Sequence, residues 1–353
     1  FGGLTTVYAY TDQGLVQSVW YPMGNSVTYE YDSLSARRRS QADVLKVTRR
    51  ADQVRQGPEL TTSYTYYEHT NLLKTGTDAR NHATTYTRNE TGDLTMIAYA
   101  DATATSVVSD AYGRPQIVTD PEGKVTRYDY YAETAPGGGG ATMSARRLDP
   151  SGGGYLQSVT VDVGGDNISQ TFDYHDRGAL KHQTDATGGG ANVTMIDEYD
   201  QPRSVTYGSG EAQYTASIEY YLTGRLRTRS ERGLTETFTY TPMNLLDSAT
   251  RIGEGVSESA SFQYDADFKL ETRSDFHGVP ERLVYDDLDR LVEQHRAGIR
   301  KQSLEYDNNG NVTKLKDGEN HERTFAYDGH DRRKSATDPL THSVSYTLDE
   351  NGN

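Results

Sequence analysis

Tyrosines recur along this chain at an almost constant spacing, and each closes a short segment of alternating side chains. From Tyr264 the intervals are 21, 21, 21 and 19 residues, and Ser109 takes the tyrosine position in one further copy. A period of this length predicts one supersecondary unit per repeat, with each unit stacked on its neighbours. The repeat tyrosines are Tyr10, Tyr31, Tyr66, Tyr86, Tyr130, Tyr174, Tyr199, Tyr220, Tyr240, Tyr264, Tyr285, Tyr306, Tyr327 and Tyr346.

The residues before each tyrosine have the period of a β-strand. In VTYEYD, Val27, Tyr29 and Tyr31 share one side, while Thr28 and Glu30 take the other. An aspartate usually follows the tyrosine, and an apolar residue such as Leu180, Leu226, Leu291 or Val312 then opens a return strand. Each repeat of about 21 residues is therefore predicted to be one β-hairpin.

The turns have their own signature. Glycine or aspartate stands four residues after the tyrosine, as expected where a hairpin needs a positive φ or a side chain that bonds its own backbone. These residues are Gly14, Gly178, Gly224, Gly310, Asp289 and Asp331. The second connection is polar, with proline in TDPEGK (119–124), LDPSGG (148–153) and TDPLTH (337–342).

These patterns predict an all-β fold of tandem antiparallel hairpins in one continuous curled sheet, because a lone hairpin is unstable in water. The composition predicts a thin sheet. Hydrophobic residues make up 34% and include 27 tyrosines, and the mean hydropathy is −0.80. We expect the tyrosines of successive repeats, such as Tyr285, Tyr306 and Tyr327, to stack in a ladder.

The regular pattern is interrupted in three intervals. We interpret 32–63, 132–155 and 187–192 as loops inserted into a single segment, 1–353, because the repeat resumes after each. The one helix candidate is 36–55. The chain starts without Met and stops in mid-pattern, so we expect it to be a piece of a longer protein.

The composition argues against several classes of protein and of functional site. The absence of Cys excludes a disulfide framework, Cys-ligated zinc and a thiol nucleophile. The formal net charge of −15 argues against a nucleic-acid binder. The sequence contains no run of 18 apolar residues, so no membrane span is predicted.

Together, the period, the Tyr-Asp pair, the turn and the Asp-Pro connection resemble the RHS/YD-repeat family. The clearest copies are FDYHDRGAL (172–180), LVYDDLDRLVEQ (283–294), LEYDNNGNVTKL (304–315) and FAYDGHDRR (325–333). The resemblance implies a hollow shell. Family members include the shells of bacterial polymorphic toxins, the C components of insecticidal toxin complexes and the teneurins. The implied partners are the remaining shell repeats, an encapsulated toxin polypeptide of the same protein and components of a secretion system or toxin complex.

Some residues suggest chemistry, but each has a structural interpretation that we favour. The alternating Asp307, Asn309 and Asn311 suggest a Ca²⁺ loop, yet the required glycine and glutamate are misplaced. We interpret that segment, like the neighbouring acid groups Asp265/Asp267 and Asp286/Asp287/Asp289, as a turn. His175 and His182 are seven residues apart and could lie on paired strands, as a solvated pair rather than as metal ligands.

The one basic cluster in this acidic chain has two interpretations. It could bind an acidic partner or the contents of the shell. We favour an insertion whose arginine face is solvated. The residues are Arg37, Arg38, Arg39, Lys46, Arg49, Arg50 and Arg55.

No catalytic, cofactor-binding or metal-binding residues emerge, so the chain is expected not to be an enzyme. The first functional hypothesis is a non-catalytic segment of a shell that encapsulates a C-terminal toxin in a secreted bacterial polymorphic toxin. The alternative is an extracellular adhesion module that binds glycans or proteins through exposed tyrosines. Both place the protein outside the cell or at its surface.

Overall fold

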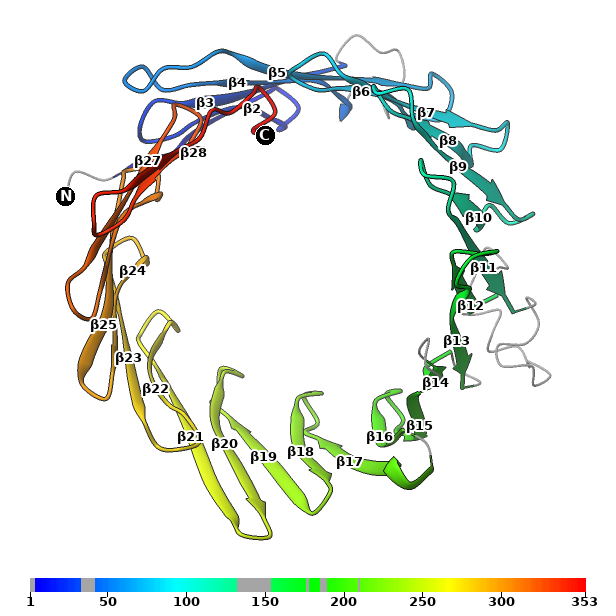
Figure 1. Ribbon diagram of the computed structural model, residues 1–353, viewed down its shortest axis with the longest axis vertical. Coiled ribbons are helices and arrows are strands. Elements are labelled where there is room, and N and C mark those ends of the chain that lie inside the picture. Colours follow the sequence, from blue (N-terminus) through cyan, green and yellow to red (C-terminus); the bar gives the residue numbers. More distant parts are fainter. Residues whose placement is uncertain (1–3, 33–41, 132–153, 176–177, 185–188, 209) are drawn as a thin grey trace. The chain divides into compact units, whose positions relative to one another are not determined.

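The computed structural model describes residues 4–32, 42–131, 154–175, 178–184, 189–208 and 210–353. These residues form one 29-stranded antiparallel sheet, with a single short 3-10 helix and no α-helix. Strands follow one another in chain order (Figure 1). The predicted all-β fold of tandem hairpins is confirmed.

The strands fall into two units. Unit 1 comprises Phe1–Thr87, Ala98–Ala102 and Pro280–Asn353, and unit 2 comprises Arg88–Ile97 and Thr103–Val279. The strands of unit 1 are β1 (Val7–Tyr10), β2 (Val16–Trp20), β3 (Ser26–Tyr31), β4 (Val44–Arg50), β5 (Leu60–Tyr66), β6 (Leu73–Thr77), β7 (Ala83–Arg88), β23 (Pro280–Tyr285), β24 (Leu291–Arg296), β25 (Ile299–Tyr306), β26 (Val312–Asp317), β27 (Glu322–Tyr327), β28 (Arg333–Thr337) and β29 (Ser343–Ser345). Those of unit 2 are β8 (Leu94–Ala98), β9 (Ala104–Ser109), β10 (Pro115–Thr119), β11 (Val125–Tyr130), β12 (Leu156–Val161), β13 (Ile168–Tyr174), β14 (Leu180–Thr184), β15 (Gly190–Ile196), β16 (Pro202–Tyr207), β17 (Tyr214–Tyr220), β18 (Leu226–Glu231), β19 (Leu234–Tyr240), β20 (Leu246–Gly253), β21 (Val256–Tyr264) and β22 (Leu270–Ser274), with the 3-10 helix η3 (Gly210–Ala212) before β17.

Most repeat tyrosines are the last residues of their strands, and their hydroxyls tie that end to the preceding strand. The Tyr306 hydroxyl donates to the Leu291 carbonyl at 2.6 Å, and that of Tyr327 donates to the Val312 carbonyl at 2.9 Å. The acceptor is in each case the first residue of the preceding strand. The same bond is made by Tyr31, Tyr66, Tyr130, Tyr240 and Tyr264.

A β-bulge accompanies each of these tyrosines. Tyr306 pairs with Val312 and Glu305 pairs with Lys314, so Thr313 is an extra residue in the return strand. Such a bulge increases the local right-handed twist. The return strand has the same extra residue after the residue that pairs with Tyr31, Tyr66, Tyr130, Tyr174, Tyr220, Tyr240, Tyr264, Tyr285 and Tyr327.

Many of the turns share one hydrogen-bond pattern built on an aspartate. In the turn after Tyr306, Asp307 Oδ1 accepts the backbone N–H groups of Asn309 and Asn311 at 3.0 and 2.9 Å. Gly310 has a φ of 91°, as predicted. We call the sheet edge with the turns that follow repeat tyrosines the Tyr edge, and the opposite edge the connection edge. The same aspartate pattern occurs on both edges, at Asp78, Asp110, Asp120, Asp197, Asp265, Asp275, Asp286, Asp317, Asp328, Asp338 and Asp349.

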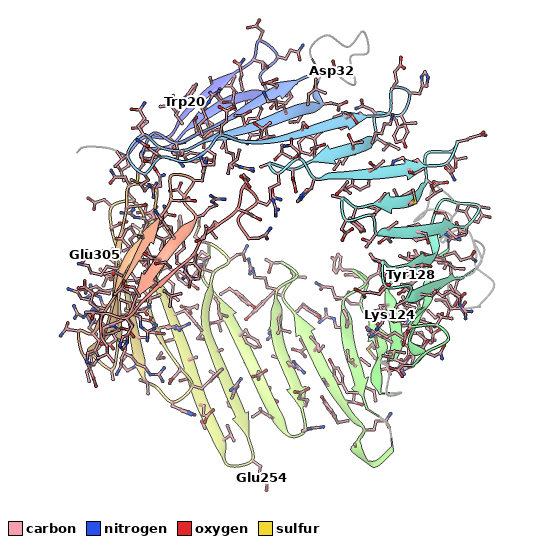
Figure 2. All side chains as sticks on the ribbon, turned by 45° about the horizontal axis from the view of Figure 1, so that its top comes forward. Trp20, Asp32, Lys124, Tyr128, Glu254 and Glu305 are labelled. Carbon is pink, nitrogen blue, oxygen red and sulfur yellow. The ribbon has the colours of Figure 1, made fainter. Side chains whose placement is uncertain are left out.

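The sheet has a thin apolar layer instead of a deep core. Side chains project from both faces of the strands (Figure 2). The register of β25 and β26 places Leu304 opposite Leu315 on one face and Glu305 opposite Lys314 on the other. The buried apolar residues of the described segments are few, and all but Leu60 are Val or Ala: Val19, Val47, Leu60, Val193, Val205, Ala216, Ala249 and Ala260.

Three repeat tyrosines occupy other positions than the sequence pattern indicates. Tyr199 lies in the turn from Asp197 to Gln201 and is 67% exposed, because Ile196 takes the strand end and pairs with Pro202. Tyr86 lies inside β7, which continues to Arg88. Tyr346 follows β29, and the next turn begins only at Asp349. After Tyr86 and Tyr346 the turns therefore start two residues later than in the other repeats.

The predicted helix and two predicted loops need correction. Residues 44–50, inside both the helix candidate 36–55 and the loop 32–63, form β4. Pairing of Val47 with Tyr29 and with Thr62 favours a strand here, because it buries Val47 between two neighbouring strands. β15 begins at Gly190, so the loop 187–192 is also shorter than expected. Residues 33–41 and 132–153 lie outside the described residues.

The hydroxyl bond at the strand ends should have a measurable stability contribution. Tyr306→Phe should lower the free energy of unfolding by about 1 kcal/mol, because the Leu291 carbonyl loses a donor. Tyr306→Ala should cost more, about 2–4 kcal/mol, because the half-buried ring is also lost. Urea unfolding measures both. Tyr10→Phe is the matched control, since Tyr10 is 58% exposed, and it should cost under about 0.5 kcal/mol. A Tyr306→Phe cost equal to the control would contradict this role.

Candidate functional site

Arginines at the ends of the Tyr-edge turns link successive repeats. The Arg290 guanidinium bonds the Asp286 carboxylate through Nε at 2.8 Å and Nη2 at 2.7 Å. It also lies 4.7 Å from the centre of the Tyr306 ring and donates Nη1 to the Asp307 carbonyl at 3.0 Å. The ring contact and the bond to the Asp307 carbonyl reach into the next repeat. The stacking partner of Tyr306 is thus a guanidinium, where we expected a neighbouring tyrosine ring.

The same arrangement recurs in other repeats. Arg114 bonds Asp110 and covers the Tyr130 ring at 4.3 Å. Arg332 bonds Asp328 and donates to the Asp349 carbonyl at 2.7 Å. Burial raises the pKa of these aspartates, but hydrogen bonds from the arginine and from backbone N–H groups outweigh burial, so the pKa lies below the ordinary value at Asp110, Asp286 and Asp328.

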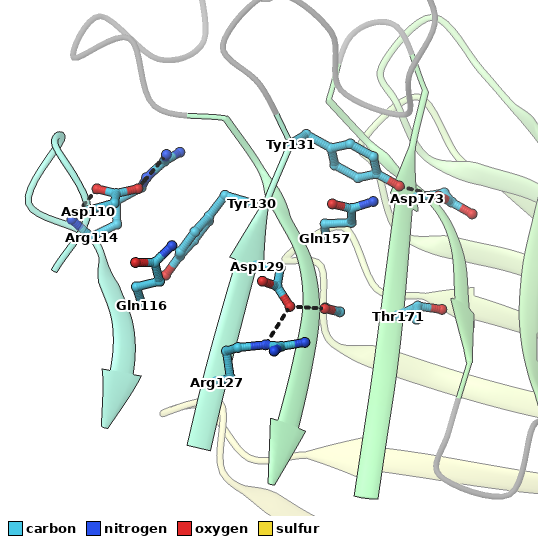
Figure 3. A pocket seen from close by; sticks show the side chains of 11 residues that line it. Asp110, Arg114, Gln116, Arg127, Asp129, Tyr130, Tyr131, Gln157, Thr171 and Asp173 are labelled. Carbon is cyan, nitrogen blue, oxygen red and sulfur yellow. Dashed lines mark hydrogen bonds and ion pairs between the residues drawn. The ribbon is translucent and has the colours of Figure 1, made fainter. Parts of the chain in front are cut away.

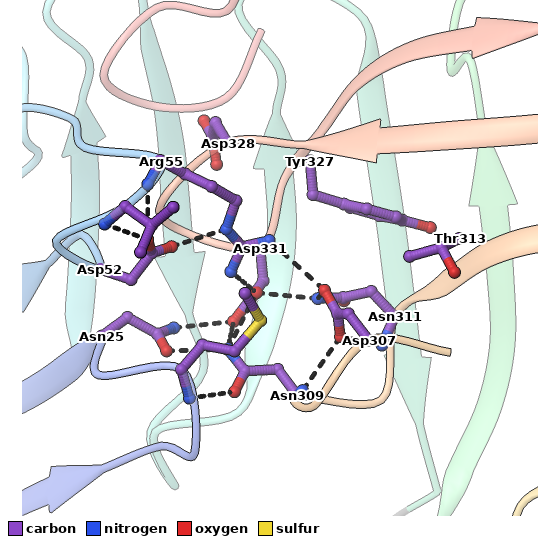
Figure 4. A network of polar contacts seen from close by, with 12 residues as sticks. Asn25, Asp52, Arg55, Asp307, Asn309, Asn311, Thr313, Tyr327, Asp328 and Asp331 are labelled. Carbon is purple, nitrogen blue, oxygen red and sulfur yellow. Dashed lines mark hydrogen bonds and ion pairs between the residues drawn. The ribbon is translucent and has the colours of Figure 1, made fainter. Parts of the chain in front are cut away.

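A second polar cluster joins hairpins that are far apart in the sequence of unit 1 (Figure 4). Its centre is Arg55, in the connection-edge turn after β4. Arg55 Nε bonds Asp52 at 2.6 Å, and its two terminal nitrogens reach Asp331 at 2.8 Å and Asp307 at 3.4 Å. The Asp52 side chain is fully buried. A buried carboxylate requires a charge partner, and Arg55 supplies it.

Asparagine side chains complete the cluster. Asn25, in the turn after β2, donates to Asp331 at 2.7 Å and accepts from Asn309 at 2.8 Å. Asn311 donates to Asp331 at 2.8 Å. We call Asn25, Asp52, Arg55, Asp307, Asn309, Asn311 and Asp331 the polar latch. It joins the connection edge of early hairpins to the Tyr edge of late ones.

The backbones approach closely at the latch. The Asp52 N–H donates to the Gly329 carbonyl at 3.0 Å. A Cβ atom at Gly329 would lie 2.6 Å from both Ala51 Cβ and the Gln56 carbonyl oxygen, so only glycine fits this position. His330 Nε2 donates to the Pro58 carbonyl at 2.6 Å.

Further along both edges the contacts continue at a similar sequence separation. Arg80 bonds Asp349 at 2.7 Å and Asn351 donates to Asp78 at 2.6 Å. Across the latch and this second pair, the partners are 252 to 306 residues apart. Each of these contacts in unit 1 therefore joins two hairpins that are separated by a similar number of residues along the chain.

Unit 2 contains a polar cavity of about 760 Å³ over β10 to β13 (Figure 3). Its charged groups are paired: Arg114 with Asp110, Arg127 with Asp129 at 3.2 Å, and the Tyr131 hydroxyl with Asp173. Burial, then the bond to Asp173, raises the pKa of Tyr131 to about 12, which keeps its proton in place at neutral pH. The cavity is lined by Asp110, Arg114, Gln116, Arg127, Asp129, Tyr130, Tyr131, Gln157, Ser158, Thr171 and Asp173.

The structure also places the other residues singled out by sequence. The turn interpretation of Asp307, Asn309 and Asn311 is confirmed, although sequence gave no sign of their latch partners about 250–300 residues away. Asp265 and Asp286 are turn aspartates, as expected. Within the described residues, no group of three or more acidic, His or Cys side chains is arranged to hold a metal ion.

The basic cluster is solvated in part. Arg49 and Arg50 are exposed at the end of β4, and Lys46 and Arg50 pair at the surface with Glu30 and Glu59. Arg55 instead forms the latch, and Arg37, Arg38 and Arg39 lie outside the described residues. His182 pairs across the strands with Asp173, and His175 follows β13. His175 Nε2 and His182 Nδ1 are buried without a hydrogen-bond partner among the described residues.

Comparison with known proteins identifies the family of the repeats. The RHS repeat family model matches residues 306–342. No curated protein sequence matches significantly. The sequence match identifies an RHS repeat at residues 306–342, and the recurrence of the same hairpin along the described strands supports an RHS/YD-repeat family and a structural role in a shell. Among the described residues, none of the helices is long and apolar enough to cross a membrane.

Solved structures of toxin complexes share the fold. A crystal structure of TcdB2–TccC3–Cdc42 matches with a TM-score of 0.69 and 15% identity over 98% of this chain. The Photorhabdus luminescens Tc holotoxin pore, with a mutated TccC3, matches at 0.69 and 16% identity over 99%. TcdB2–TccC3 without its hypervariable C-terminal region matches at 0.69 and 15% over 98%. This chain spans only 21% of the length of each matched chain.

The latch should contribute more stability than an exposed ion pair in the same turn. Arg55→Met leaves the buried Asp52 without a partner and should cost about 3 kcal/mol. Hydrogen exchange should accelerate in 21–25 and 328–332 together, because both contact the latch. Arg50→Met is the control: Arg50 and Glu59 are both exposed, and its loss should cost under about 1 kcal/mol. Equal effects of the two variants would contradict the latch.

The latch should also weaken at acid pH. Burial raises the pKa of Asp52, but bonds from Arg55 and Val54 and the charge of Arg55 outweigh it, so the pKa is lowered. A lowered folded-state pKa stabilises above the unfolded value, about 3.9, and the stabilisation is lost as the pH falls through the folded-state pKa. We expect wild-type stability to decline below about pH 4, with a smaller decline in Arg55→Met. Parallel pH curves for the two proteins would show that Asp52 is not responsible.

Proposed function

We propose that this chain is a non-catalytic wall segment of an RHS-repeat container that encloses a toxin polypeptide of the same protein. The single observation that carries the proposal is the edge-to-edge contact in unit 1. There, the Tyr edge of late hairpins lies against the connection edge of early ones at a nearly fixed separation. Hairpins that meet both their neighbours and a distant layer can build a continuous wall.

The chemistry of the described residues favours a wall over an enzyme. The turn aspartates are engaged by backbone N–H groups and arginines, and the cavity's charged groups are paired with each other. A general base or nucleophile would need a group that is free to react. We therefore propose that any self-cleavage or toxic activity of the whole protein resides in other segments.

The neighbours in toxin complexes support the rest of the proposal. The matched structures are Tc toxin assemblies, and one of them is TcdB2–TccC3 without its hypervariable C-terminal region. By analogy, the partners of this chain are further RHS repeats, an enclosed C-terminal polypeptide and toxin-complex or secretion components. We propose that it acts as part of a secreted polymorphic toxin or at the cell surface.

The cavity of unit 2 favours a second candidate, an adhesion module that binds glycans. Two amides, Gln116 and Gln157, and two tyrosines line it beside paired charges (Figure 3). Amides offer both donors and acceptors to sugar hydroxyls, and aromatic rings offer apolar faces. Under this alternative, Gln157→Ala should weaken binding of a neutral oligosaccharide, whereas a container needs no such ligand.

Limited proteolysis of the full-length protein tests the container. The polypeptide after the wall should resist protease at least 10-fold longer than the same polypeptide expressed alone, because the wall excludes the protease. Arg55→Met should shorten this protection, and Arg50→Met should preserve it. The comparison of Arg55→Met with Arg50→Met tests the integrity of the wall without any change to the enclosed polypeptide. Cleavage of the following polypeptide at the rate seen in isolation, in a folded wild-type protein, would contradict enclosure.

A further inference from the structure

The sequence contains two Asn-Gly pairs, and both lie in Tyr-edge turns that contact a distant hairpin. They are Asn309-Gly310 and Asn351-Gly352. Asn309 belongs to the polar latch, where its side-chain amide donates to Asn25 at 2.8 Å. The Asn351 amide donates to Asp78 at 2.6 Å. Asparagine followed by glycine is the pair most prone to spontaneous deamidation, because glycine has no side chain to hinder attack on the asparagine amide.

Deamidation has a defined course at Asn309. The backbone nitrogen of Gly310 loses its proton to a base such as hydroxide and attacks the side-chain carbonyl carbon of Asn309. The new N–C bond closes an imide ring as the bond to the amide nitrogen breaks, and that nitrogen leaves as ammonia. Water then opens the ring at either carbonyl and leaves aspartate or isoaspartate at position 309. The net reaction consumes water and releases ammonia, with no change in oxidation state.

The closed latch engages both reacting groups. The Gly310 N–H donates to the Asp307 carbonyl at 3.1 Å. The nitrogen that must leave, Asn309 Nδ2, donates to Asp331 at 2.9 Å (Figure 4), and Asn309 Oδ1 accepts the Met23 N–H at 3.0 Å. These partners hold the asparagine side chain in place until the turn opens. Gly310 is exposed, so water and hydroxide reach it when that happens.

The product of the reaction is incompatible with the closed latch. Asn309 Nδ2 lies 3.1 and 2.9 Å from the two carboxylate oxygens of Asp331. Deamidation replaces this donor by a carboxylate oxygen, so two like charges face each other at hydrogen-bond distance. The latch already holds three carboxylates around the single guanidinium of Arg55. A fourth carboxylate must share the same cation, and this opposes reclosure.

Asn311, in the same turn, provides an internal comparison. Its side chain also donates to Asp331, at 2.8 Å. The next residue is Val312, however, and its β-branched side chain hinders the attack that Gly310 permits. Two asparagines of one turn with a common partner therefore differ in the residue that would attack them.

We propose that Asn309 is a site of spontaneous deamidation that is gated by the polar latch. The closed latch protects the asparagine, each opening exposes it to attack, and the product prevents the latch from closing again. The reaction converts a reversible contact into an irreversible opening, at a rate set by the population of the open latch. Asn351 is a second site of the same kind. The proposal goes beyond the wall role and does not depend on what the wall encloses.

Peptide mass spectrometry of the full-length protein tests the gating. Native protein is incubated in mildly alkaline buffer, and tandem spectra resolve deamidation at Asn309 from deamidation at Asn311. Arg55→Met opens the latch without changing the Asn-Gly pair, and Arg50→Met, outside the latch, is the control. We expect deamidation at Asn309 to be at least 10-fold faster in Arg55→Met than in the wild type and in Arg50→Met. Equal rates in the three proteins, or equal rates at Asn309 and Asn311, would overturn the proposal.

Variants that carry the charge of the product test its effect on the latch. Asn309→Asp should accelerate hydrogen exchange in 21–25 at least 10-fold, because the contact with Asn25 is lost. Asn308→Asp adds the same charge at the preceding, exposed residue of the turn and should leave exchange there unchanged. Equal exchange in Asn309→Asp and the wild type would overturn the irreversible opening. Proteolytic protection of the enclosed polypeptide is measured separately, so failure of the gating and failure of enclosure remain distinguishable.

Discussion

The hydrogen bonds to the turn aspartate are the interaction on which this sheet depends. One carboxylate oxygen, such as Asp286 Oδ1, accepts two backbone N–H groups that a tight turn would otherwise leave unpaired. The second oxygen accepts a hydrogen bond from an arginine four residues after the aspartate. Because the same device closes turns on both edges, strands of three to nine residues can follow one another along the described chain. Regular turns make the long regular sheet possible.

Stability between the turns comes from contacts that a thin sheet can make. There are few large aliphatic side chains to bury, so each repeat is tied to the next by the tyrosine hydroxyl, the bulge and the arginine over the ring. A guanidinium over an aromatic face contributes a fraction of a kcal/mol to about 2 kcal/mol, depending on solvent exposure. Repetition adds these modest terms along the chain, as in other repeat proteins whose units contact only their neighbours.

The latch adds contacts between hairpins that are far apart in the sequence, which contacts between neighbouring repeats cannot supply. Its residues come from turns whose conformations are already fixed, which lowers the entropy lost when Arg55 joins Asp307 and Asp331. Gly329 permits the close backbone approach that brings these turns together.

Sequence alone determined the hairpins, the turns and the all-β class, because strand alternation and a positive φ at the turn are local properties of the chain. It misplaced Tyr199, Tyr86 and Tyr346, since the spacing of the tyrosines does not reveal that β15 ends at Ile196, β7 at Arg88 and β29 at Ser345. The helix expected over 36–55 failed at 44–50 because β3 and β5 provide pairing that no local pattern records. Only the tertiary structure decided that Arg55 meets Asp331. Contacts between residues more than 250 positions apart depend on the accumulated twist of many hairpins, and that sum is not encoded in any single repeat.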